Sequence, residues 1–101
     1  MTNYDVYATE SFKKLYSTLD RSEQIWIEKM KKQLEDYPTG KPLHYDWFRE
    51  KKYLNKRLYF LIDETTKKIL FTAFASKKEQ QKTINFVIAN KEELLNHLRN
   101  L

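Results

Sequence analysis

The chain has 101 residues, a net charge of +5 and no cysteine. Its 41% hydrophobic and 15% aromatic residues exclude a disordered chain and predict one domain, residues 1–101, with a modest core. Without cysteine there are no disulfides or thiolate metal sites, and with only two histidines we expect no metal and no cofactor. No apolar run approaches about 18 residues and the N-terminus lacks a signal-peptide pattern, so we expect a cytoplasmic protein with no membrane association.

The first forty residues predict a short strand followed by two helices. Alternating residues at 4–8 are typical of a strand, and Thr9 is expected to cap a helix whose apolar residues recur at helical spacing. Ser22 is expected to open a second helix, which ends at the Tyr37–Gly40 segment because proline and glycine interrupt it. Asp20-Arg21 would join the two helices as an antiparallel pair.

The second half predicts strands and then helix. Alternation and β-favouring residues indicate strands at 43–50, 57–63 and 68–75, with a polar hairpin loop at 63–67. Ser76 and Glu79 have capping-box spacing, and Asn90 to Glu93 repeats it, so we expect two final helices or one kinked helix. The fold class is therefore α+β, with the helices packed on one face of a small antiparallel sheet.

Residues 48–60 are expected to fold back as two strands around Leu54-Asn55. In the second of these strands Leu58, Phe60 and Ile62 share one face, while Arg57, Tyr59 and Leu61 share the other. The first face predicts a core. The second begins with a cation and a phenol, which favours water or a ligand, and RNA is the first candidate because bases stack on aromatic rings.

The positive charge is concentrated in this region. Residues 41–82 contain eleven Lys and Arg against five acids, a net of +6, whereas the remainder contains eight against nine, a net of −1. Such a segment attracts nucleic acid or an acidic protein, although a solvated lysine-rich surface would look the same.

Three consecutive segments resemble the RelE/ParE superfamily of toxins from bacterial and archaeal toxin–antitoxin systems: R-L-Y-F-L-I-D-E at 57–64, I-L-F-T-A-F-A at 69–75 and S-K-K-E-Q at 76–80. The P-x-G-K-P-L pattern at 38–43 is similar to the segment before the second strand of related toxins. Chain size and element order agree over essentially the whole length. The resemblance implies a RelE-like fold, with an N-terminal strand and a two-helix hairpin on a small antiparallel sheet, followed by one or two C-terminal helices.

The resemblance also implies a metal-independent endoribonuclease that cleaves mRNA on the ribosome and is silenced by a cognate antitoxin. Residue by residue it points to a catalytic set consisting of Arg49, Glu50, Lys51, Arg57, Lys77 and Lys78. Such cleavage needs a base for the 2′-hydroxyl proton, an acid for the leaving oxygen and cations to stabilise the phosphorane, which suit a carboxylate among cations. We expect RNA to bind through Lys52, Tyr53, Lys56 and Tyr59.

Two other functions remain open. Several relatives place a tyrosine or histidine early in the terminal segment, where this chain has Lys82-Thr83-Ile84-Asn85. Tyr53 or Tyr59 would have to substitute for that group in an active nuclease. The absence of a tyrosine or histidine early in the terminal segment favours a ParE-like toxin that acts on DNA gyrase and cleaves no RNA. The third hypothesis is a catalytically degenerate module that binds nucleic acid or protein through its basic surface.

Overall fold

The computed structural model describes residues 3–101, which form four α-helices, five β-strands and one short 3₁₀ turn. In chain order these are β1 (Asp5–Ala8), α1 (Glu10–Thr18), α2 (Arg21–Asp36), β2 (Lys41–Leu43), β3 (Tyr45–Tyr53), β4 (Lys56–Asp63), β5 (Lys68–Ser76), η1 (Lys77–Glu79), α3 (Gln80–Ala89) and α4 (Lys91–Arg99). The predicted α+β class is confirmed, and the break at Asn90 makes the C-terminal segment two helices.

The strands form one sheet in the order β1-β5-β4-β3-β2. Three neighbouring pairs are antiparallel, whereas β1 lies parallel to β5, so the sheet is mixed and not purely antiparallel. The two-residue turn at Leu54 and Asn55 joins β3 to β4, as predicted. A separate short strand, β2, forms the far edge, where the sequence had predicted only the start of the 43–50 strand.

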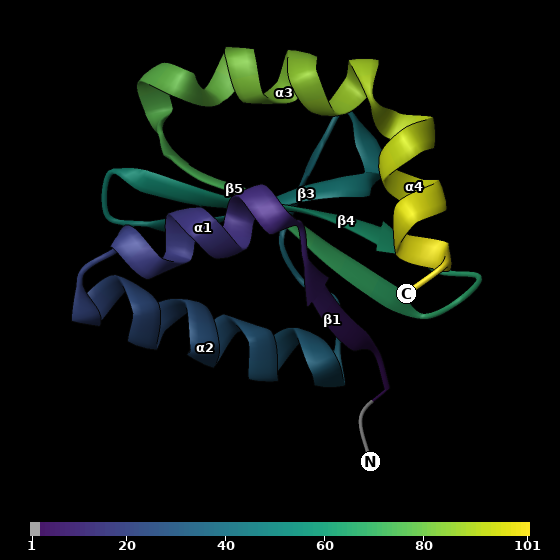
Figure 1. Ribbon diagram of the computed structural model, residues 1–101, viewed down its shortest axis with the longest axis horizontal. Helices are drawn as coiled ribbons and strands as arrows, with labels where there is room; N and C mark the ends of the chain where they lie inside the picture. The colour runs from purple at the N-terminus through teal and green to yellow at the C-terminus, as the bar shows by residue number, and fades with distance from the viewer. Residues whose placement is uncertain (1–2) are drawn as a thin grey trace.

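Helices cover both faces of the sheet, which corrects the expectation that they pack on one face. α1 and α2 lie on one side and α3 and α4 on the other, with the sheet between them (Figure 1). The core on the first side includes Phe12, Leu34 and Phe60, and the core on the second includes Phe48 and Val87. The mixed face of β4 is therefore covered by protein, because the C-terminal segment supplies enough apolar side chains to pack against it.

Helix caps explain where α1 and α2 begin. The Thr9 hydroxyl accepts a hydrogen bond from the Phe12 N–H, as predicted. α2 is capped by Asp20 and not by Ser22: Asp20 accepts from the Glu23 N–H, and Glu23 accepts from the Asp20 N–H, which completes a capping box.

The caps predicted for the C-terminal helices are absent. Neither Ser76 nor Asn90 makes a side-chain capping hydrogen bond; the Asn90 amide instead donates to the Phe86 carbonyl of the preceding helix. Among the described residues, no helix is both long and apolar enough to cross a membrane.

Candidate functional site

The pairing of β3 with β4 determines which side chains meet. The short turn between the strands places Lys52 opposite Arg57 and Glu50 opposite Tyr59. Directly opposed residues project from the same face of a sheet. The face of the sheet that α3 and α4 cover therefore carries Arg57, Tyr59, Glu50 and Lys52.

Glu50 and Arg57 form an ion pair in the interior on this face. The Arg57 Nε lies 3.4 Å from Glu50 Oε2, and the two side chains are 13% and 9% exposed. This Nε is not aligned for a hydrogen bond and has no other hydrogen-bond partner among the described residues. Gln80, the first residue of α3, donates from Nε2 to Glu50 Oε2 over 3.1 Å. The segment after β5 thus crosses this face and closes it.

Tyr59 completes the cluster. Its ring is fully buried, and its hydroxyl has no hydrogen-bond partner among the described residues. Burial raises the pKa of Tyr59 to about 12, and the negative charge of Glu50 acts in the same direction while Arg57 opposes it. The hydroxyl is consequently protonated at neutral pH. Burying a polar group without a hydrogen bond is costly, so this position is unusual for a purely structural tyrosine.

Arg49 and Lys51 do not belong to this cluster, although the sequence analysis grouped them with Arg57. Both project from the opposite face of β3, because strand side chains alternate. Arg49 donates to the backbone carbonyls of Pro38 and Asp46 and so anchors the segment before β2. Lys51 donates to the Gln33 side chain on α2 over 2.6 Å, and burial lowers its pKa.

Two of the four expected RNA-binding side chains are occupied in packing on that opposite face. The Tyr53 ring packs on Trp26, with 4.9 Å between ring centroids. Lys56 forms a 2.6 Å ion pair with Glu23 and lies over the Phe74 ring. The third, Tyr59, is buried, so of the four only Lys52 is exposed.

Several cations of residues 51–78 gather at one end of the sheet. Lys56 of β4 pairs with both Tyr53 of β3 and Ser76 of β5, so the end of β3, the start of β4 and the end of β5 lie together. Lys77 and Lys78 follow directly in η1 and are exposed. We call this the basic end, defined by its cationic residues Lys51, Lys52, Lys56, Arg57, Lys77 and Lys78. Its freely exposed members are Lys52, Lys77 and Lys78.

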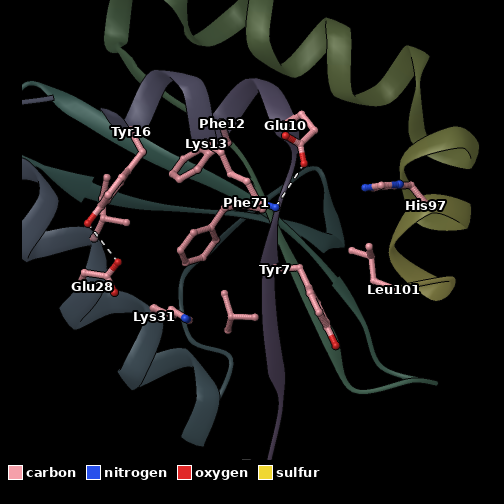
Figure 2. A pocket seen from close by; sticks show the side chains of 13 residues that line it. Tyr7, Glu10, Phe12, Lys13, Tyr16, Glu28, Lys31, Phe71, His97 and Leu101 are labelled. Carbon is pink, nitrogen blue, oxygen red and sulfur yellow. Dashed lines mark hydrogen bonds and ion pairs between the residues drawn. The ribbon is translucent and has the colours of Figure 1, made fainter. Parts of the chain in front are cut away.

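A pocket of about 420 Å³ lies elsewhere, along the open edge of β1. Figure 2 shows Phe12 and Phe71 on one side of β1 and His97 and Leu101 on the other. Two pairs of charged and polar groups at its rim contact one another, Lys13 with Glu10 and Tyr16 with Glu28. None of the predicted site residues lines it. We therefore place the candidate site at the Glu50–Arg57–Tyr59 cluster, which contains two of the three buried polar side-chain atoms without a hydrogen-bond partner among the described residues; the third is the Thr39 hydroxyl.

Two features of this site were not predicted from the sequence. Gln80 was not singled out, since its contact with Glu50 is made only when the terminal helix folds back. The pairing of Glu50 with Tyr59, however, follows from the turn: residues that flank a two-residue turn pair first, and the pairs then continue outward. Within residues 3–101, no cluster of three or more His, Asp or Glu side chains could hold a metal ion.

Comparison with known proteins adds no assignment: neither the family models nor the curated proteins include a match to this chain.

Proposed function

We propose that this protein is a RelE/ParE-type toxin that cleaves mRNA at the ribosome without a metal ion and is silenced by a cognate antitoxin. The observation that carries the proposal is the Glu50–Arg57 ion pair beside the unpartnered Tyr59 hydroxyl. Exposed Lys52, Lys77 and Lys78 at the same end of the sheet supply positive charge for the RNA backbone. The sequence resemblance supports the family, and the order of the elements is consistent with it.

The three residue types match the three needs of RNA cleavage. Glu50 removes the proton of the 2′-hydroxyl, whose oxygen attacks the adjacent phosphorus. Arg57 stabilises the negative charge of the phosphorane that forms. Tyr59 gives its proton to the departing 5′-oxygen, and the products are a 2′,3′-cyclic phosphate and a free 5′-hydroxyl. Tyr59 is protonated at neutral pH, as this role requires.

The cluster is closed in this structure, so access is part of the proposal. Glu50 is 8% exposed, and Gln80 holds its carboxylate. RNA first meets the exposed lysines of β3 and η1, and the segment Ser76–Gln80 then moves aside so that a phosphate reaches Arg57. Breaking the Gln80–Glu50 hydrogen bond is part of that movement.

Glu50→Gln tests the proposal most directly, because it removes the base while keeping the shape of the side chain. We expect RNA cleavage to fall by about 10²-fold or more. Expression would be induced in cells, with growth and mRNA integrity followed over time, and cleavage on ribosomes would be mapped by toeprinting.

The matched control is Asp46→Asn, which removes an exposed carboxylate from the same strand. Circular dichroism would verify that both variants fold. Cleavage by Glu50→Gln at the rate of the unmodified protein would exclude Glu50 as the base.

A ParE-like toxin that acts on DNA gyrase is the second candidate. The observation that favours it is the closure of the cluster: Arg57 is already paired with Glu50, and Tyr59 is fully buried. This candidate predicts growth arrest with intact mRNA and inhibition of gyrase in a supercoiling assay. If neither mRNA nor gyrase is affected, the remaining reading is a basic binding module without toxic activity.

A further inference from the structure

An aromatic stack lies at the other end of β3, away from the basic end. The rings of Tyr45 and Trp47 are 5.1 Å apart and within 20° of parallel, and those of Trp47 and Phe48 are 5.8 Å apart and within 18°. Phe48 is fully buried beneath α3 and α4 and anchors the stack, whereas Tyr45 at its outer end is 45% exposed. The stack therefore ends in a ring that is open to a further partner.

One cation lies against this stack. Lys91, the first residue of α4, places its Nζ 4.8 Å from the centroid of the Trp47 ring. Asp46, which lies between the two stacked residues in sequence, is also exposed. Lys41 of β2 is exposed too, but it pairs with Glu50 and not with a residue of the stack.

Backbone geometry fixes the outer ring. His44 joins β2 to β3 with a φ of +70°, and Leu43 pairs directly with Tyr45 across this tight turn. A left-handed backbone at a residue with a side chain is costly, so the turn is held by the pairing around it. Tyr45 is therefore presented from a defined strand position and not from a long loop.

We propose that Tyr45 and Trp47, with Lys91, form a base-stacking subsite for single-stranded RNA. An exposed aromatic ring next to cations is the arrangement that binds unpaired bases without regard to sequence, because every base has a π face. This inference rests on the proposed RNA function and adds to it where a flanking nucleotide is held. Tyr45 begins β3, five residues before Glu50 and at the end of the strand away from the basic end, so we assign it a nucleotide that flanks the cleaved one.

The experiment separates stacking from charge. Trp26→Phe leaves Trp47 as the only tryptophan, so its fluorescence reports on the subsite. This protein is titrated with a 2′-O-methyl oligouridine, which lacks the attacking hydroxyl, and with inorganic polyphosphate, which has charge and no bases. We expect quenching by the oligouridine and none by polyphosphate.

Tyr45→Ala, in the same background, is expected to weaken oligouridine binding by about tenfold and to leave polyphosphate binding unchanged. Tyr37→Ala is the matched control, because Tyr37 is 70% exposed and lies outside the stack. Fluorescence anisotropy of labelled oligouridine gives the affinity of each variant, and thermal unfolding checks the fold.

The outcomes distinguish this subsite from the proposed catalysis. Equal oligouridine affinity for Tyr45→Ala and the Tyr37→Ala control overturns the stacking subsite and leaves the cleavage proposal standing, and the surface then serves another partner. A tenfold loss with Tyr45→Ala in a protein that leaves mRNA on the ribosome intact supports the subsite and excludes the nuclease. Binding of neither oligouridine nor polyphosphate overturns the subsite, whereas cleavage at the ribosome is tested separately by toeprinting.

Discussion

Tyr59 places a hydroxyl in the interior beside Glu50 and Arg57, where no hydrogen bond satisfies it among the described residues. A hydroxyl in such a position lowers the stability of the fold, since its desolvation is not compensated. A protein that uses the hydroxyl as an acid would retain it despite this cost. Removing the Tyr59 hydroxyl should therefore raise the stability of the fold and lower the RNA-cleaving activity.

We expect Tyr59→Phe to raise the free energy of unfolding by about 1 kcal/mol while lowering RNA cleavage. Urea unfolding measures the first effect at pH 7. Tyr59→Phe should also change how the free energy of unfolding depends on pH above pH 10. The unfolded tyrosine ionises near pH 10 and the folded one near 12. The free energy of unfolding of the unmodified protein is therefore unaffected by this ionisation below pH 10 and decreases as pH rises from 10 through 12, because only the unfolded state loses the proton there.

Tyr53→Phe is the control for that experiment, since Tyr53 packs its ring on Trp26 and lies outside the Tyr59 cluster. The two variants should differ between pH 10 and 12, where only Tyr59→Phe removes the steep loss of stability. Identical curves would show that the Tyr59 hydroxyl is hydrated or otherwise satisfied in solution.

Because side chains alternate along β3, cations that are adjacent in sequence lie on opposite faces of the sheet. Lys52 lies opposite Arg57, whereas Lys51 lies opposite Leu58 and contacts α2 through Gln33. A single-residue shift thus changes a cation from a candidate RNA contact to a packing contact. Residue type alone does not distinguish the two, and only the pairing register does.

At the scale of elements, α3 helps to close the candidate site. It contributes two buried side chains to the core, Ile84 and Val87, and Gln80 to the ion-pair cluster. Its other apolar residues, Phe86 and Ile88, are 59% and 38% exposed. At the end of α4, Arg99 forms an ion pair with buried Asp63.

Val87→Ala and Phe86→Ala test this division of the α3 surface. We expect Val87→Ala to lower the free energy of unfolding by about 2 kcal/mol, since it leaves a cavity beneath the helix. Phe86→Ala should change it by about 0.5 kcal/mol or less, because the ring is already in water. Denaturant unfolding measures both; a loss with Phe86→Ala as large as with Val87→Ala would contradict the burial pattern.

At the scale of the whole molecule, the charge excess is divided between two structural roles. Arg49, Lys51 and Lys56 contact other parts of the fold, and Lys52, Lys77 and Lys78 remain exposed at the basic end. The positive surface that is free to bind RNA is therefore smaller than the net charge of +6 over residues 41–82 suggests.

Replacing the three exposed lysines with alanine should weaken RNA binding and reduce its dependence on salt. If each contacts one phosphate, the slope of log K against log salt should decrease in magnitude by about 2. The matched control is Lys14→Ala, Lys29→Ala and Lys32→Ala, which removes the same charge from exposed positions on α1 and α2. Equal effects of the two triple variants would mean that RNA senses net charge and not the basic end.

The sequence by itself determined the α+β class, most of the elements and the hairpin at Leu54-Asn55, because these depend on local periodicity, turn residues and the Thr9 cap. It also contained the pairing of Glu50 with Tyr59, through the length of that turn. Only the tertiary structure decided that β1 adds in parallel to β5 and that α3 and α4 cover the mixed face of β4. Those outcomes depend on contacts between residues far apart in the chain, where apolar burial overrides what each segment indicates alone.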